Sequence, residues 1–394
     1  MSQIKIALCG IGGYAKLYTN YILDKHDPRI LPVGVVEPFP ESCPRLAELQ
    51  EAGIPVYETL DDLYREHHPD LTVIATPIQC HTPQILTALA NGSHVLCEKP
   101  LCADAGDVEK LRQASRAAGR FVFIGYQWSY SDAVLGLKKD ILSGRFGRCL
   151  DMKSIVLWPR DLAYYRRGCG WAGKITLEDG TPVYDSIANN ATAHYLHNML
   201  FLLGEDGHAA VPESIRGELL RANAIENFDT CKIDLTMPGS AEVHFLASHA
   251  VDTVMNPVFH FRFEKADVYY AQNDSPLARS ILPEAYTQFG QITAVLPDGT
   301  HVCYGNPFAN DLAKLERAID AACRGDLREY PCGIEAASAH TGVITCLQQN
   351  ETVWNIAETK LVRTPEKVFV PGLGETMLEC FRHPELSLSD WREE

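Results

Sequence analysis

The stretch that decides the fold is residues 4–15, IKIALCGIGGYA, in which a short apolar run passes directly into glycines. Residues 4–9 form an apolar run typical of a strand that is buried on both faces. Gly10, Gly12 and Ala15 then make a G-x-G-x-x-A pattern that opens a helical segment. In this pattern the first glycine permits a tight turn, the second lets the backbone approach a pyrophosphate, and the small third residue lets helix and strand pack closely. The stretch therefore predicts a dinucleotide site.

The residues that follow repeat the same alternation of buried strand and amphipathic helix. Further strands are predicted at 31–36, 71–75, 94–97 and 121–125. Helices are predicted between them at 14–24, 59–67, 83–91 and 103–118. Strands that alternate with helices in this way form a parallel sheet covered on both faces. We therefore predict a doubly wound Rossmann domain over residues 1–125.

The pattern changes after residue 126. A helix is predicted over 133–143 and precedes the run CLDMKSIVLW, and period-two strands separated by turn residues dominate from Ser214. Two late helices are predicted at 308–325 and 335–349. This order predicts an α+β domain over 126–394, with a large, mostly antiparallel sheet and a carboxyl-terminal extension from about residue 350.

Composition narrows the kinds of partner. The 394 residues carry a formal net charge of −16, which argues against nucleic acid or an anionic membrane as the main partner. The 13 cysteines form no C-x-x-C pair, and their odd number fits reduced thiols. We find no signal-peptide pattern and no apolar run near 18 residues, and we expect a cytoplasmic protein that binds no membrane.

Glu37 indicates which dinucleotide the first domain would bind. It closes the second predicted strand, in VGVVEP. An acidic residue at that place can bind both ribose hydroxyls and repels a 2′-phosphate. The sequence therefore favours NAD over NADP as the cofactor.

A lysine follows the strand predicted at 94–97. In the run HVLCEKP, Glu98, Lys99 and Pro100 fall at the carboxyl end of the strand, where doubly wound sheets bind ligands. Pro100 biases Lys99 toward an extended backbone. A lysine in this place beside a nicotinamide could take the proton of a substrate hydroxyl, provided that its pKa is lowered toward neutral pH.

Together these motifs resemble the Gfo/Idh/MocA family, which includes glucose–fructose oxidoreductase and inositol dehydrogenase. The resemblance rests on the glycine pattern, ATP…H at 75–81, EKP at 98–100, a His-bearing helix that ends in LLG, and the segment from 312 to 333. It implies NAD(P)-dependent hydride transfer at a carbinol carbon of a sugar, glycoside or cyclitol, with Lys99 as the base. It also implies an open-faced sheet in the second domain that often forms oligomer contacts, so we expect a homodimer or homotetramer.

The predicted cofactor contacts lie in the first domain, except for Gln127, which lies just after it. We predict that they are Gly10, Gly12, Gly13, Tyr14, Ala15, Glu37, Thr76, Pro77, His81, Glu98, Lys99 and Gln127.

The run NNATAHYLHNMLFLLG, residues 189–204, carries the other candidate catalytic residue. At helical spacing, Asn190, His194 and His197 share one face. Members of the family usually show D-x-x-x-H-x-x-D here, so the resemblance implies that His194 contacts the reacting hydroxyl while both flanking acids are replaced. Asn190 can orient a substrate only through hydrogen bonds. A metal site lacks a third ligand, and His197 is equally well read as a core histidine.

An aromatic segment over 154–173 precedes this helix. Aromatic rings stack on the apolar faces of sugars, and arginines donate to hydroxyls or acidic substituents, although ordinary packing explains any single ring as well. The predicted substrate contacts are Tyr126, Trp158, Arg160, Tyr165, Trp171, Asn190, His194 and His197.

Three functions remain open from the sequence. The first is an NAD-dependent dehydrogenase with Lys99 as general base and His194 as hydroxyl partner. The second retains NAD and cleaves a glycoside by transient oxidation and elimination. The third is a non-catalytic protein of the same fold that senses a sugar or nucleotide.

Overall fold

The computed structural model describes residues 3–167, 170–325 and 331–393. Parts of the aromatic segment and of the turn after the late helix, 168–169 and 326–330, lie outside these ranges. The chain divides into two compact units. Unit 1 comprises residues 1–127 and 311–338, and unit 2 comprises 128–310 and 339–394. The sequence placed the boundary after residue 125 and assigned 311–338 to the second domain, whereas this segment packs with unit 1.

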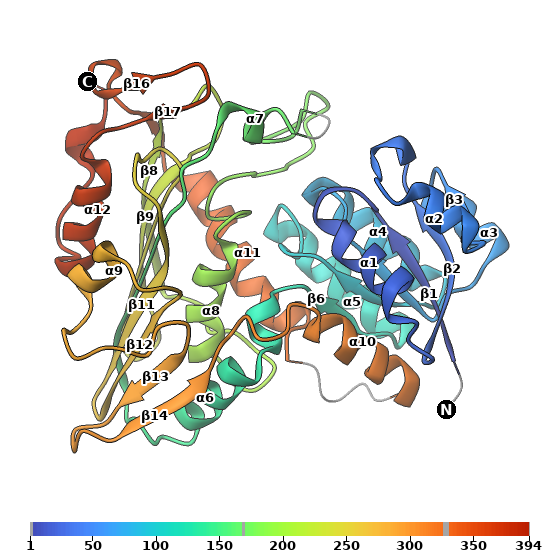
Figure 1. Cartoon of the computed structure of the whole chain (residues 1–394), viewed down its shortest axis with the longest axis horizontal. Helices are drawn as coiled ribbons and strands as arrows, with labels where there is room; N and C mark the ends of the chain where they lie inside the picture. Colours follow the sequence, from blue (N-terminus) through green and yellow to red (C-terminus); the bar gives the residue numbers. More distant parts are fainter. Residues whose placement is uncertain (1–2, 168–169, 326–330, 394) are drawn as a thin grey trace. The chain divides into compact units, whose positions relative to one another are not determined.

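Unit 1 is built on one parallel sheet of six strands in the order β3–β2–β1–β4–β5–β6 (Figure 1). The strands are β1 (Ile4–Cys9), β2 (Ile30–Val36), β3 (Val56–Tyr57), β4 (Leu71–Ile74), β5 (His94–Cys97) and β6 (Val122–Ile124). Chain order reverses between β1 and β4, which is the switch point where doubly wound sheets bind ligands. The predicted Rossmann sheet is therefore confirmed. The prediction omitted β3, which has only two residues.

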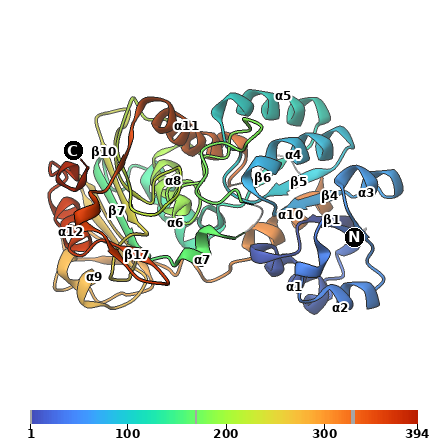
Figure 2. The same cartoon turned by 90° about the horizontal axis from the view of Figure 1, so that it is seen from above.

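Helices cover both faces of this sheet. They are α1 (Lys16–Lys25), α2 (Leu46–Glu51), α3 (Leu60–Glu66), α4 (His81–Ala90), α5 (Val108–Ala118) and α10 (Ala313–Arg324). Figure 2 shows α4 and α5 on one face, and α1 and α10 on the other. The ends of these helices follow from local chemistry. Thr59 caps α3 by accepting from the backbone N–H of Asp62 at 3.2 Å, and Gly119 ends α5 with a φ of +60°.

Unit 2 is built on a sheet of nine strands in the order β14–β13–β12–β11–β7–β10–β9–β8–β15. The strands are β7 (Cys149–Leu157), β8 (Ser214–Arg221), β9 (Thr230–Thr236), β10 (Glu242–Ser248), β11 (Met255–Phe263), β12 (Ala266–Ala271), β13 (Ile292–Val295), β14 (His301–Gly305) and β15 (Val353–Asn355). The pairs β7–β10 and β8–β15 are parallel and the other pairs are antiparallel. The prediction of a large, mostly antiparallel sheet is confirmed.

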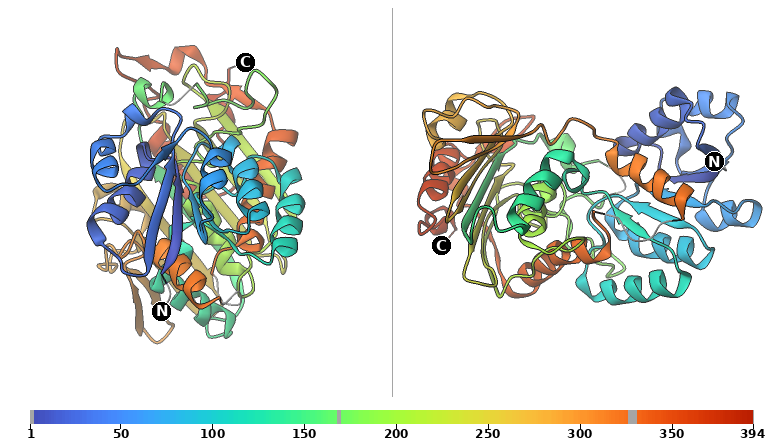
Figure 3. Two further views of the ribbon diagram at one scale, coloured as in Figure 1. Left: turned by 90° about the vertical axis from the view of Figure 1, so that its right-hand side faces the viewer. Right: turned by 90° about the horizontal axis from the view of Figure 1, so that it is seen from below.

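Helices pack on both faces of the larger sheet. Figures 1 and 3 show α6 (Asp132–Leu142), α8 (Ala193–Leu203) and α11 (Ile334–Asn350) on one face, and α9 (Pro276–Ile281) and α12 (Leu373–Arg382) on the other. Met377 and Phe381 of α12 share a buried cluster with Ile155 of β7 and Leu246 of β10. Part of the face that the resemblance implied to be open is thus covered by the carboxyl-terminal extension, because α12 presents an apolar stripe to it.

Short elements complete the description. They are α7 (Leu162–Tyr165), β16 (Val362–Arg363), β17 (Val368–Phe369) and the 3-10 helices η1 (Gly13–Ala15), η2 (Pro40–Ser42), η3 (Ile78–Cys80), η4 (Ala105–Asp107), η5 (Gln127–Tyr130), η6 (Glu358–Lys360) and η7 (Ser389–Trp391). Among the described residues, we find no helix that combines the length and apolar character needed to cross a membrane.

Candidate functional site

The glycine loop, residues 10–15, connects β1 to α1 through the 3-10 helix η1. Gly10 has a φ of +87°, and a Cβ there would lie 2.8 Å from the carbonyl oxygen of Ala75, so both the backbone angle and the close approach require glycine. Gly13 has a φ of +52°, but a Cβ there would meet no atom of the described chain within 4 Å. One side of the loop is therefore packed against β4, while the position of Gly13 borders open space in which a ligand can approach the backbone.

Glu37 lies against this loop. The backbone N–H of Ile11 donates to Glu37 Oε2 at 3.3 Å, and the N–H of Phe39 donates to Oε1 at 3.2 Å. These bonds hold the half-buried carboxylate beside the loop. A carboxylate in this position accepts hydrogen bonds from ribose hydroxyls and repels an added phosphate.

The other predicted cofactor residues collect at the same edge of the sheet. Each group directly follows the carboxyl end of β1, β2, β4, β5 or β6, and parallel strands bring those ends together. Tyr14 illustrates the proximity, because its hydroxyl donates to Gln127 Oε1 at 3.2 Å across 113 residues of sequence. The structure thus gathers the predicted cofactor residues at one edge of unit 1.

Glu98 is fixed by a partner that the sequence did not indicate. The ammonium of Lys314, on α10, forms an ion pair with the Glu98 carboxylate, and the Tyr18 hydroxyl donates to the same oxygen. The Lys314 side chain is 0% exposed. Burial works against its charge, but the Glu98 carboxylate outweighs it and raises the pKa of Lys314. Glu98 is therefore a buried anchor for the turn that carries Lys99.

Lys99 and His81 lie around that turn. Lys99 is half-buried, its backbone N–H donates to Glu98 Oε2 at 3.3 Å, and its peptide bond to Pro100 is cis. His81 Nδ1 is 2.7 Å from the carbonyl oxygen of Pro100, and Nε2 is 3.0 Å from that of Thr76. His81 is only 1% exposed, and its two ring contacts connect the loop after β4 to the turn after β5.

Tyr126 is one of the predicted substrate contacts. It follows β6 but is 0% exposed, and burial raises the pKa of its hydroxyl well above the usual range. The side chain is enclosed by protein in this structure, and its contact with a substrate stays a prediction.

In unit 2, Asn190 lies outside the helix that carries His194. Helix α8 begins at Ala193, and Asn190 belongs to the preceding turn. That turn is closed by its own side chains, since Asn189 Nδ2 donates to the carbonyl of Tyr184 at 3.0 Å and Thr192 Oγ1 donates to that of Ile187 at 2.7 Å. Asn and Thr compete with helix formation by such bonds, so the expected three-residue helical face was wrong.

Asp185 is a carboxylate that the sequence analysis missed. It is 3% exposed. Its Oδ1 accepts from Asn190 Nδ2 at 2.8 Å and its Oδ2 from the N–H of Gly173 at 2.6 Å, while Arg167 lies 3.8 Å away. The acid absent at position 190 is thus supplied to the same turn from five residues upstream.

The two histidines of α8 have different surroundings. His194, in the first turn, is partly exposed. His197 is 1% exposed, with Nε2 3.0 Å from Ser129 Oγ, and burial lowers its pKa well below the usual range. Burial and the Ser129 contact favour the alternative of a neutral core histidine, and the substrate contact of His197 stays a prediction.

The aromatic segment folds into a stack of rings and guanidinium groups. The Arg160 guanidinium lies 4.8 Å from the Tyr164 ring centre, and that of Arg167 lies 3.6 Å from Tyr164 and 4.9 Å from Trp171. Trp158 donates from Nε1 to Asn256 Oδ1 at 2.9 Å. The structure therefore brings the predicted Trp158, Arg160 and Trp171 side chains into one cluster within unit 2.

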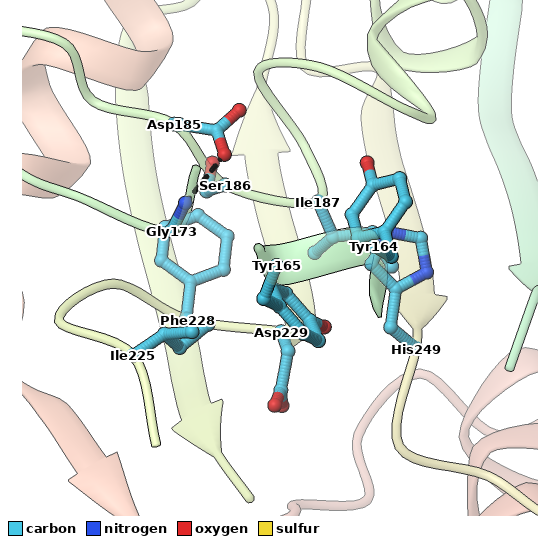
Figure 4. Close-up of a pocket in the computed structure, with 10 residues that line it drawn as sticks. All are labelled: Tyr164, Tyr165, Gly173, Asp185, Ser186, Ile187, Ile225, Phe228, Asp229 and His249. Carbon is cyan, nitrogen blue, oxygen red and sulfur yellow. Dashed lines mark hydrogen bonds between the residues drawn. The ribbon is translucent and has the colours of Figure 1, made fainter. Parts of the chain in front are cut away.

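A pocket lies beside this cluster, at the sheet edge where β7 and β10 end and β9 begins. Figure 4 shows the rings of Tyr164 and His249 near each other and Asp185 bonded to the backbone of Gly173. We name it the Tyr165 pocket; its lining residues are Tyr164, Tyr165, Gly173, Asp185, Ser186, Ile187, Ile225, Phe228, Asp229 and His249.

The sequence analysis missed four residues. Asp185, Asp229 and His249 line the Tyr165 pocket, and Lys314 pairs with Glu98 in unit 1. Asp185 follows a turn in VYDS and could have been singled out as an acid close to Asn190. The others carry no local signal. Within residues 3–167, 170–325 and 331–393, we find no group of three or more His, Cys, Asp or Glu side chains able to hold a metal ion.

Comparisons with known proteins agree with this geometry. Residues 4–126 match the sequence model of GFO_IDH_MocA, described as an oxidoreductase family with an NAD-binding Rossmann fold. The chain is 27% identical over 205 residues to inositol 2-dehydrogenase of Rubrobacter xylanophilus, which covers 52% of this chain and 53% of that enzyme. The match thus spans about half the length of that relative.

Solved structures resemble the chain over most of its length. The WlbA dehydrogenase from Bordetella pertussis, in complex with NADH and UDP-GlcNAcA, superposes with a TM-score of 0.69 at 21% identity and covers 88% of this chain and 96% of that one. The aldose-aldose oxidoreductase from Caulobacter crescentus gives a TM-score of 0.66 at 19% identity, over 88% of this chain and 97% of that one. At these identities the likeness establishes the fold.

Proposed function

We propose that the chain, whose residues 4–126 match the Gfo/Idh/MocA oxidoreductase family, is an NAD-dependent dehydrogenase that oxidises a carbinol carbon of a sugar, glycoside or cyclitol. The observation that carries the proposal is the bond between the glycine loop and Glu37. It places a carboxylate beside a backbone turn that is open at Gly13, which is the arrangement that a dinucleotide without a 2′-phosphate requires.

The residues of unit 1 fit this cofactor. The glycine loop leads through η1 into α1, so the positive end of a helix is available to phosphate groups. Glu37 receives the ribose hydroxyls, and the residues after β4, β5 and β6 line the same edge. When bound, NAD supplies the acceptor for a hydride from the substrate carbon.

Two side chains of this chain carry the proton chemistry in the proposal. Lys99, as the neutral amine, takes the proton of the substrate hydroxyl while the hydride leaves the adjoining carbon. His194 hydrogen-bonds the same hydroxyl and orients it. Asn190, held by Asp185, fixes the turn that precedes His194. The buried pair of Glu98 and Lys314 fixes the turn that carries Lys99.

The substrate class follows from unit 2 and from the relatives. Aromatic rings interleaved with guanidinium groups suit the apolar faces and hydroxyls of a carbohydrate. The matched relative is named an inositol 2-dehydrogenase and a similar structure an aldose-aldose oxidoreductase. We also propose that the protein is cytoplasmic and that it forms a homo-oligomer. Light scattering of the purified protein measures its mass in solution and so tests the assembly.

The test is a panel of sugars, glycosides and cyclitols incubated with the purified protein and NAD, with NADH absorbance as the readout. We expect Lys99→Ala to reduce turnover by about 10²–10⁴-fold while the protein still binds NADH, which is followed by its fluorescence. Lys110→Ala, at an exposed position of α5, is the control. Cleavage of a glycoside without accumulation of NADH would favour the redox-neutral alternative, and full activity of Lys99→Ala would remove the catalytic assignment.

A further inference from the structure

The Tyr165 pocket contains an unused hydrogen-bond acceptor on His249. This residue follows β10, is 2% exposed, and its Nδ1 lies 2.7 Å from the carbonyl oxygen of Trp158. Because a carbonyl only accepts, Nδ1 carries the proton, and Nε2 of the neutral ring presents a lone pair. Among the described residues, none forms a hydrogen bond with Nε2, although the atom is buried.

The same pocket contains an unused hydroxyl on Tyr165. This residue ends the short helix α7, and its ring packs edge to face with Tyr164 at a centroid distance of 5.2 Å. Its buried hydroxyl has no hydrogen-bond partner in the described part of the chain. Burial raises the pKa of Tyr165, so the group keeps its proton and can donate it.

Two polar atoms of this kind select the chemistry of a ligand. A buried polar atom without a hydrogen-bond partner costs about 1–3 kcal/mol. A ligand group that bonds to His249 Nε2 and to the Tyr165 hydroxyl is therefore favoured. An acceptor at His249 and a donor at Tyr165 match the two roles of a hydroxyl group, which can donate to Nε2 and accept from the phenol. A carboxylate has no hydrogen to give to Nε2.

The walls of the pocket support the same selection. Asp185 and Asp229 are 3% and 1% exposed, and their oxygens already accept hydrogen bonds from backbone N–H groups, so His249 and Tyr165 remain the partners for a group that enters. Ile187, Ile225 and Phe228 provide an apolar wall for the carbon that bears the hydroxyl. The space is small and partly open, which admits a single small substituent such as a hydroxyl group.

We propose that the Tyr165 pocket is a specificity subsite that binds one non-reacting hydroxyl of a neutral polyhydroxylated substrate, through His249 Nε2 and the Tyr165 hydroxyl. This assignment rests on the proposed dehydrogenase function and names a position of the substrate that the reaction itself does not change. It predicts that the protein discriminates among substrates by one hydroxyl remote from the oxidised carbon.

The test combines substrate analogues with variants of the pocket. The probes are myo-inositol, D-glucose, methyl glucosides and their monodeoxy analogues, assayed for NADH formation and, separately, for binding by calorimetry. Tyr165→Phe removes only the hydroxyl. His249→Asn keeps a donor for the Trp158 carbonyl and removes the Nε2 acceptor. The control is Tyr270→Phe, because the Tyr270 hydroxyl is also buried and without a partner among the described residues but does not line the pocket.

With wild type and Tyr270→Phe, we expect the analogue that lacks one particular hydroxyl to show a kcat/KM or affinity about 10–100-fold below that of the parent substrate. With Tyr165→Phe and His249→Asn, the same analogue is expected to fall less than about 3-fold below the parent, since the protein partner of that hydroxyl is already absent. An equal deoxy penalty in all four proteins would overturn the subsite, even with dehydrogenase activity intact. If wild type forms no NADH with any probe, the proposed function fails, and the calorimetric comparison then decides on the pocket alone. Absence of binding by every probe would overturn the subsite as well.

Discussion

The amide of Asn190 donates to Asp185 Oδ1 at 2.8 Å, so a buried carboxylate supports the turn before His194 although position 190 itself carries no acid. The second Asp185 oxygen accepts from the N–H of Gly173 at 2.6 Å, which joins the 173–185 segment to the same turn. The chain thus joins a buried carboxylate to the turn before His194 through a neutral amide at position 190.

We expect Asp185→Asn to lower kcat/KM by at least about 10-fold, because an amide cannot accept from both Asn190 and Gly173 with both of its polar atoms. NADH binding to unit 1 is expected to stay unchanged. The matched control is Asp179→Asn, at an exposed turn of the same segment. Steady-state kinetics and NADH fluorescence check both variants, and wild-type kinetics for Asp185→Asn would show that this carboxylate does not position the site.

The glycine loop gives a second prediction through two glycines with different surroundings. Gly10→Ala forces a Cβ to 2.8 Å from the Ala75 carbonyl oxygen at a φ of +87°, so we expect a loss of at least about 2 kcal/mol in the free energy of unfolding. Gly13→Ala also has a positive φ but meets no atom of the described chain within 4 Å, so we expect a smaller loss of stability, about 1 kcal/mol.

The two variants differ in ligand binding as well. We expect Gly13→Ala to weaken NADH binding by more than its small effect on folding, because the added methyl group occupies the open side of the loop. Urea unfolding and NADH titration of both variants measure the two effects. Equal stability losses in the pair would contradict the packing difference, and unchanged NADH affinity in Gly13→Ala would contradict the placement of the dinucleotide.

The elements predicted well from the sequence are those specified by neighbouring residues. The spacing of Gly10, Gly12 and Ala15, and the apolar runs around them, specify a strand, a turn and a helix without reference to the rest of the chain. The strand β3 was missed because Val56 and Tyr57 are too few to show a period. Asn190 was predicted to lie on the helix because the helical spacing was extended back to it. In the structure it lies in a turn that Asn189 and Thr192 close by side-chain hydrogen bonds.

The site residues that were missed act across long separations in sequence. Lys314 meets Glu98 over 216 residues, and His249 meets the carbonyl of Trp158 over 91. Such pairs depend on which strands and helices become neighbours, and a single sequence records neither the pairing nor the burial that makes it necessary. Burial also separates the two histidines of α8, since periodicity alone does not say which of His194 and His197 faces the core.

Lys314 allows a prediction about the stability of unit 1. Lys314→Met leaves the buried Glu98 carboxylate without its cation, and we expect a loss of about 3–5 kcal/mol in unfolding free energy. The double variant Lys314→Met with Glu98→Gln is expected to recover much of this loss, because no unpaired charge remains. Lys110→Met, at an exposed position, is the control for removal of a lysine. Denaturant unfolding followed by circular dichroism measures all three, and a double variant no more stable than Lys314→Met would show that the unpaired Glu98 charge is not the cause of the loss.

His249 predicts how stability depends on pH. Burial, assisted by the positive charge of Arg160, lowers the pKa of His249 to about 3, against about 6.5 in an unfolded chain. Between these values the unfolded state binds the proton and the folded state does not, so stability falls as the pH falls below about 6.5. At pH 5 this residue alone lowers the free energy of unfolding by about 2 kcal/mol relative to pH 7.

We expect His249→Asn to reduce the loss of unfolding free energy between pH 7 and pH 5 by about that amount, whereas His383→Asn, at an exposed position, leaves the dependence as in wild type. Urea unfolding at the two pH values makes the comparison, and an unchanged slope in His249→Asn would mean that the ring takes up a proton as readily in the folded chain as in the unfolded one.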